Sequence, residues 1–66
     1  MKDFHRAIGL LNDKNIKYKI LTYENYFDIS INENLHITFN IDNNCNAIFY
    51  NEGSYDIHDL YDILNL

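Results

Sequence analysis

The side chains that could do chemistry in this chain are three histidines, one cysteine and ten carboxylates. A zinc site needs cysteine, histidine or carboxylate ligands at short, recurring spacings. His5, His36 and His58 match no such spacing, Cys45 stands alone, and the three histidines are expected on a helix, a sheet face and a second helix. We therefore expect isolated surface histidines and no metal site.

Catalysis is also disfavoured by these residues. A cysteine nucleophile needs a base beside its thiol, but alternation places Cys45 on the apolar face of a strand, where a free thiol is inert packing. Carboxylates are plentiful, yet a chain of 66 residues has little room for the enclosed cleft that acid-base catalysis requires. Gly9 and Gly53 are the only glycines, so no phosphate-binding loop is present. The sequence predicts a protein that is not an enzyme and that binds no cofactor.

Charge is distributed unevenly along the chain. All five lysines and arginines precede residue 20, whereas eight of the ten carboxylates lie between Glu24 and Asp62, and the net charge is −5. Such a field favours cationic partners and repels nucleic acid and anionic membranes. Acids in turns and at helix margins also serve solubility, and Tyr26, Tyr50 and His36 could instead stack on bases. Solubility alone leaves the absence of any later lysine or arginine unexplained.

The length and the cysteine content limit the class of protein. The chain has room for one domain, residues 1–66. Cys45 cannot form an intrachain disulfide, which indicates a reducing, cytoplasmic compartment. No apolar run approaches the roughly 20 residues of a membrane-spanning helix, and no signal-peptide core follows the first residues. We expect a soluble protein with no membrane partner.

The first element is predicted to be a helix over residues 3–15. Its apolar residues follow the spacing of one helical face: Phe4, Ala7, Ile8 and Leu11. Asp3 is expected to cap the start of this helix, and Lys14 suits its negative end.

Alternation with period two then predicts three half-buried strands over residues 16–20, 27–31 and 35–41, and a fourth over 45–50. Short polar segments rich in asparagine separate them, so neighbouring strands should be antiparallel. The predicted inner row is Ile20, Phe27, Phe39 and Ala47, with a second row of Tyr18, Ile29, Ile37 and Phe49. The predicted outer row is Lys19, Asp28, Thr38 and Ile48, in which Lys19 and Asp28 form a cross-strand charge pair.

A closing helix is predicted after residues 51–54. Ser54 is the expected N-cap, Asp56 lies in the first turn, and the apolar stripe is Ile57, Leu60, Tyr61 and Leu64. The predicted fold is α+β, a four-stranded antiparallel meander with the N- and C-terminal helices on one face, in the order α-β-β-β-β-α.

Carboxylates on a rigid support could imitate the phosphates of a nucleic acid. Residues i and i+2 of a strand lie about 6.6 Å apart, similar to successive phosphates of one DNA strand. In size, charge, composition and order of helices and strands, the whole chain resembles the small acidic inhibitors that bacteriophages make against host nucleic-acid enzymes, including anti-CRISPR proteins and uracil-DNA glycosylase inhibitors. The resemblance implies a non-enzymatic inhibitor that occupies a basic nucleic-acid-binding surface of a host protein, with a CRISPR effector as the leading case.

The residues expected to face such a partner are acids of the later part of the chain and two tyrosines that could anchor the interface. They are Glu24, Asp42, Glu52, Tyr55, Asp56, Asp59, Tyr61 and Asp62. An alternative is a self-associating regulatory or structural module, a homodimer through the outer sheet face, where Leu21, Tyr26, Ile48 and Tyr50 are expected. Another is an antitoxin-like neutraliser of a basic protein, which the sequence does not separate from the first hypothesis.

Overall fold

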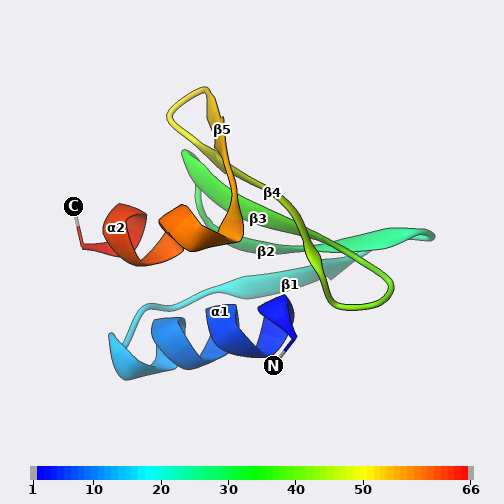
Figure 1. Ribbon diagram of the computed structural model, residues 1–66, viewed down its shortest axis with the longest axis horizontal. Helices are drawn as coiled ribbons and strands as arrows, with labels where there is room; N and C mark the ends of the chain where they lie inside the picture. The colour runs from blue at the N-terminus through cyan, green and yellow to red at the C-terminus, as the bar shows by residue number, and fades with distance from the viewer. Residues whose placement is uncertain (1, 66) are drawn as a thin grey trace.

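Five antiparallel strands form one sheet in the computed structural model, which describes residues 2–65 (Figure 1). The elements, in chain order, are α1 (Asp3–Asp13), β1 (Lys19–Thr22), β2 (Tyr26–Asn32), β3 (Leu35–Asn40), β4 (Cys45–Tyr50), β5 (Gly53–Tyr55), the 3₁₀ helix η1 (Ile57–Asp59) and α2 (Leu60–Leu64). Each strand pairs with the next one along the chain, so the sheet order is β1-β2-β3-β4-β5. In this part of the chain no helix has the length and apolar character needed to cross a bilayer.

One core holds the sheet and both helices together. Ala7 and Leu11 of α1, and Leu60 and Ile63 of α2, are buried in the same cluster as one face of the sheet. The sheet contributes Ile29, Leu35, Ile37, Phe39 and Ile48 to this cluster. Burying each large aliphatic side chain contributes about 1.5–3 kcal/mol. The two helices therefore cover one face, as predicted, and leave the other face open.

The sheet has a fifth strand that the sequence did not predict. After Tyr50 the chain turns through Asn51 and Glu52, whose φ angles are 48° and 70°, and returns as β5. Two central residues with positive φ form the type I′ turn that suits the twist of a hairpin. Ser54 consequently lies in β5, so its predicted role as N-cap is wrong.

The predicted register is correct at the centre of the sheet and wrong at its first edge. Phe27 pairs with Phe39, as expected. The tight turn after Thr22 shifts β1 relative to β2, so that Thr22, and not Ile20, pairs with Phe27. Lys19 therefore lies opposite Ser30. The predicted charge pair between Lys19 and Asp28 is wrong, because Asp28 lies opposite Leu21 and Thr38.

A β-bulge reverses the faces of β4. Adjacent residues of β3 pair with Ala47 and Cys45, so Asn46 between them has no partner. One extra residue sends every following side chain to the opposite face. Ile48 therefore points inward and is 0% exposed, while Phe49 is 41% exposed. The predicted outward position of Ile48, and with it that of Tyr50, is wrong.

The start of α1 is attached to the β3–β4 turn. Lys2 is the N-cap and makes no side-chain cap hydrogen bond. The Asp3 carboxylate instead accepts a hydrogen bond of 2.8 Å from the backbone N–H of Cys45, and the N–H of Phe4 donates to the carbonyl of Asn43 at 3.0 Å. Asp3 thus joins the helix to the sheet, and its predicted capping role is wrong.

Candidate functional site

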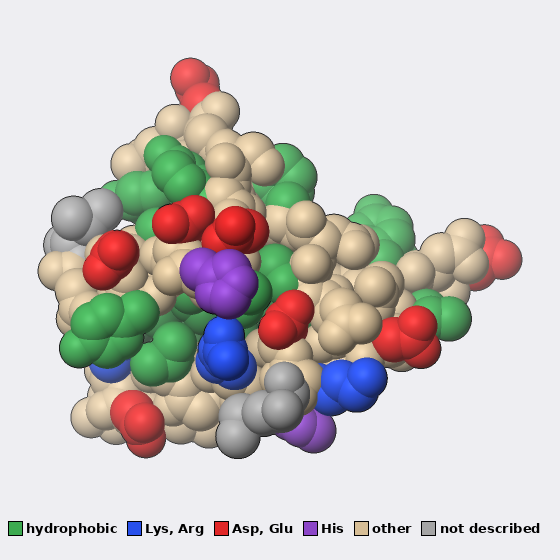
Figure 2. Space-filling model, viewed as in Figure 1, with side chains coloured by type: hydrophobic (Ala, Val, Ile, Leu, Met, Phe, Trp, Pro, Cys, Tyr) green, Lys and Arg blue, Asp and Glu red, His purple; other side chains and the backbone are tan. Residues whose placement is uncertain are grey.

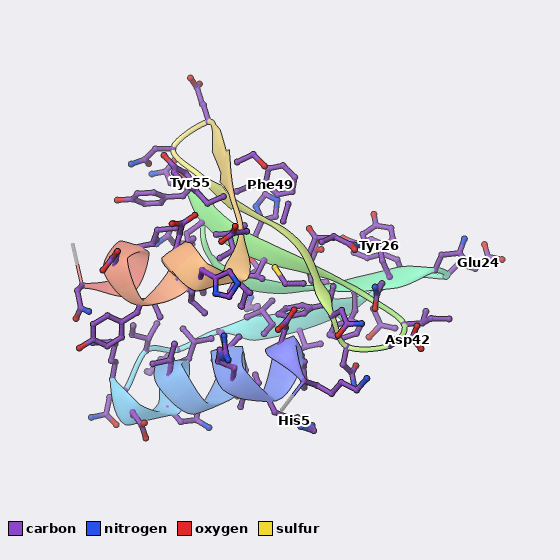
Figure 3. The ribbon with its side chains drawn as sticks, viewed as in Figure 1. His5, Glu24, Tyr26, Asp42, Phe49 and Tyr55 are labelled. Carbon is purple, nitrogen blue, oxygen red and sulfur yellow. The ribbon has the colours of Figure 1, made fainter. Side chains whose placement is uncertain are left out.

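The predicted partner-binding residues lie at three places and do not form one surface. Glu24 in the β1–β2 turn and Asp42 in the β3–β4 turn lie at one end of the sheet (Figure 3). Glu52 lies at the tip of the β4–β5 hairpin, and the remaining acids follow β5. Figure 2 shows carboxylates both at the far end of the strands and over the C-terminal helical segment.

The end of the sheet with Glu24 and Asp42 is held by polar turn contacts. The Asn40 side-chain oxygen accepts hydrogen bonds from the backbone N–H groups of Asp42, at 2.9 Å, and Asn44, at 3.1 Å. Beside Glu24, the rings of Tyr23 and Tyr26 stack with centroids 4.6 Å apart. This end therefore presents two exposed carboxylates on a braced support.

Two of the C-terminal acids have a structural function. The Asp56 carboxylate accepts from the N–H of His58 at 2.9 Å, and the Asp59 carboxylate accepts from the N–H of Asp56 at 3.3 Å. These reciprocal contacts form a capping box that starts η1. Asp62, one turn beyond Asp59, is exposed.

A groove between the β4–β5 hairpin and α2 brings acids and aromatic rings together. It has a volume of about 210 Å³ and is lined by Tyr50, Tyr55, Asp59, Asp62 and Ile63. The two tyrosine ring centroids lie 6.4 Å apart with the ring planes at 55°, and residue Tyr55 is 41% exposed. In Figure 3, Tyr55 lies on the α2 side of the hairpin, whereas Phe49 lies on its other side. This combination of rings and carboxylates suits a cationic group.

Gly53 positions the Tyr55 ring. A Cβ atom at residue 53 would lie 2.9 Å from Tyr55 ring atoms, closer than such contacts occur. Gly53 also pairs with Tyr50 across the hairpin. The absence of a side chain at Gly53 therefore allows the Tyr55 ring to fold back beside Tyr50.

Tyr61, the other predicted anchor, lies outside this groove. The Lys14 ammonium lies over the Tyr61 ring, 5.1 Å from the ring centroid. The same ammonium donates a hydrogen bond to the Asn65 side-chain oxygen at 2.6 Å. Tyr61 thus helps to join the end of α1 to α2. It remains 58% exposed rather than part of the buried stripe predicted for the closing helix.

Cys45 is poorly suited to react. Burial, followed by the nearby carboxylates of Asp3 and Asp56, raises the pKa of the Cys45 thiol from 9.0 to about 11. The thiolate, which is the nucleophilic form, is therefore scarce at neutral pH. Across residues 2–65, no three histidine, cysteine or carboxylate side chains gather as a metal site would require.

The open face of the sheet carries exposed apolar side chains and one unusual acid. Leu21, Tyr26 and Phe49 are each at least 40% exposed on this face. Opposite Leu21 on the same face, one carboxylate oxygen of Asp28, Oδ1, is buried without a hydrogen-bond partner among residues 2–65. A buried polar atom of this kind lowers stability.

Sequence reasoning named three residues of the groove, Tyr55, Asp59 and Asp62, and missed Tyr50 and Ile63. The signal that could have found Tyr50 is the two-residue turn before Gly53. Such a turn brings the following segment back beside β4 and so places Tyr55 next to Tyr50.

No protein-family model, curated protein or solved structure matches this chain.

Proposed function

We propose that this protein is a non-enzymatic inhibitor that binds a basic, nucleic-acid-binding surface of another protein, with a CRISPR effector as the leading target. Its carboxylates occupy positions where the partner would otherwise hold phosphates. The partner's lysines and arginines lose access to nucleic acid as a result.

The observation that carries the proposal is the exposure of acids with which no lysine or arginine of residues 2–65 forms an ion pair. Six of the eight carboxylates after residue 20 are exposed: Glu24, Glu33, Asp42, Glu52, Asp56 and Asp62. The side-chain hydrogen bonds that reach carboxylates in residues 2–65 come from backbone N–H groups. Such a surface attracts a basic partner over distances set by the ionic strength.

The test is displacement of nucleic acid from a candidate target. Purified CRISPR effector–guide complexes are mixed with labelled target DNA, and DNA binding is followed by fluorescence anisotropy as the protein is added. We expect DNA binding to fall, and the association rate of the two proteins to fall steeply with added salt, because separated charges are screened beyond about 8 Å at physiological ionic strength.

A panel of effectors in which DNA binding never changes would exclude the anti-CRISPR case. The wider proposal is tested by capture from a host lysate at low and high salt. Each captured protein is then assayed for loss of nucleic-acid binding. Capture only of proteins that lack a nucleic-acid site would show that the inhibitor proposal is wrong.

A second candidate function is self-association through the open sheet face. The exposed side chains of Leu21, Tyr26 and Phe49 support it, because they lie on the face opposite α1 and α2, and an exposed apolar patch commonly marks an interface. Replacing Phe49 with lysine should then shift the sedimentation coefficient towards that of the monomer. A wild-type protein that is monomeric at high concentration would exclude this function.

A further inference from the structure

The groove lined by Tyr50, Tyr55, Asp59, Asp62 and Ile63 is small and open on one side to solvent. Its volume of about 210 Å³ is below the roughly 300–1,000 Å³ of ordinary small-molecule pockets. Ile63, 8% exposed, supplies an apolar contact from α2. A space of this size fits one protein side chain better than a free metabolite.

The carboxylates of the groove are available to a ligand. One oxygen of Asp59, Oδ2, accepts from the backbone of Asp56, which leaves Oδ1 without that contact. Asp62 is exposed on the next turn of the same helical segment. The contacts of the Lys14 ammonium in residues 2–65 are with Tyr61 and Asn65, which lie outside the groove.

We propose that the groove binds one arginine side chain of the partner, an inference that rests on the proposed function. The guanidinium stacks against the Tyr55 ring and donates hydrogen bonds to Asp59 and Asp62, while its aliphatic stem packs on Ile63. Arginine fits better than lysine because its planar head both stacks on rings and donates several hydrogen bonds in a fixed geometry.

The test uses arginine as a small probe, independent of any target protein. N-acetyl-arginine methylamide and the matching lysine compound are titrated into ¹⁵N-labelled protein and followed by NMR. We expect saturable shifts confined to β5 and the C-terminal helices, at millimolar concentration, with the lysine compound binding several-fold more weakly. Asp62→Asn should weaken arginine binding about two- to fivefold, the usual effect of losing a charge pair between exposed groups.

Asp13→Asn is the matched control, because it removes one exposed carboxylate outside the groove and should leave the arginine affinity unchanged. Gly53→Ala is a second variant, chosen to displace the Tyr55 ring without changing charge, and it should also weaken binding. Circular dichroism of each variant verifies that it is folded. Shifts spread evenly over all acids, or equal effects of Asp62→Asn and Asp13→Asn, would overturn the proposal.

The site and the function fail in different ways. Arginine binding in the groove without displacement of nucleic acid from any target would support the site and contradict the inhibitor function. Displacement that persists unchanged in Asp62→Asn and Gly53→Ala would support the function and show that the groove is not its anchor.

Discussion

Asp28 shows how one residue can act against the stability of the fold. Its Oδ1 atom is buried without a partner on the open face, opposite Leu21 and Thr38. Aspartate is also among the residues that strands disfavour. The acid at this position therefore lowers the free energy of unfolding, and no contact within residues 2–65 compensates this oxygen.

We predict that Asp28→Thr raises the free energy of unfolding by about 1 kcal/mol, because it removes the unpaired oxygen and suits a strand opposite Thr38. Urea denaturation measures the change. Asp28→Asn is the control, since it keeps a polar side chain at the same position and should gain less. A threonine variant that is less stable than the wild type would show that Asp28 makes a favourable contact.

Cys45 gives a prediction about pH. Its thiol pKa is raised from 9.0 to about 11 in the folded state. Between these values the unfolded chain releases the thiol proton while the folded chain keeps it, so stability falls as the pH rises. Well below pH 9 both states keep the proton, and the thiol contributes no pH dependence there.

We therefore expect the wild type to lose stability more steeply between pH 9 and pH 11 than Cys45→Ala, measured as unfolding free energy at several pH values. The comparison of slopes removes the contribution of every group that the two proteins share. Parallel slopes would mean that the thiol ionises as readily in the folded protein as in the unfolded chain.

At the scale of elements, the β4–β5 hairpin decides the geometry of the groove. Its turn places Glu52 at φ 70°, a conformation that glycine adopts readily and that other residues adopt at a cost of roughly 1–2 kcal/mol. Asparagine tolerates such angles better, which suits Asn51 to the preceding position. The N–H of Asn51 also donates to the carbonyl of Asn34 at 3.0 Å, so this turn is tied to the β2–β3 turn.

Glu52→Gly is predicted to stabilise the protein by about 1 kcal/mol in thermal or urea unfolding, because it relieves the positive φ angle. Glu52→Gln keeps the angle strained and removes only the charge, so it should not stabilise by this mechanism. Equal gains from both variants would assign the effect to charge repulsion rather than to the backbone.

The three acids of the C-terminal helical segment, Asp56, Asp59 and Asp62, should not be replaced together in one variant. Asp56 and Asp59 form the capping box of η1, so replacing them costs helix stability, typically about 1 kcal/mol for a cap. Asp62 has no part in that box. A variant of Asp62 alone therefore separates partner binding from folding, which a triple variant would combine.

At the scale of the whole molecule, the net negative charge should prevent the protein from binding nucleic acids. With a net charge of −5, the purified protein should not bind duplex or single-stranded DNA, or RNA, at physiological salt. A gel-shift assay at micromolar protein concentration measures this. Salt-sensitive binding to any of these nucleic acids would contradict the phosphate-mimic interpretation.

Much of the architecture follows from local patterns in the sequence. The helical spacing of Phe4, Ala7 and Leu11 and the alternation along β2 and β3 depend only on the periods of a helix and a strand. These patterns predicted α1, the central register and the position of both helices on one face. The positions of the charged residues likewise established that all lysines and arginines precede residue 20 and that most carboxylates follow it.

The tertiary structure decided the rest, because the pairing of strands and the contacts between elements are not marked by the periodicity of side chains. The bulge at Asn46 turned Ile48 into the core, and a strained two-residue turn created β5, although no periodicity marked either feature. Asp3 bonds Cys45 across 42 positions of sequence, and Tyr50 meets Tyr55 only because the hairpin closes. Side-chain types in the sequence therefore determined which chemistry was available, and backbone pairing determined which of those side chains came together in the groove.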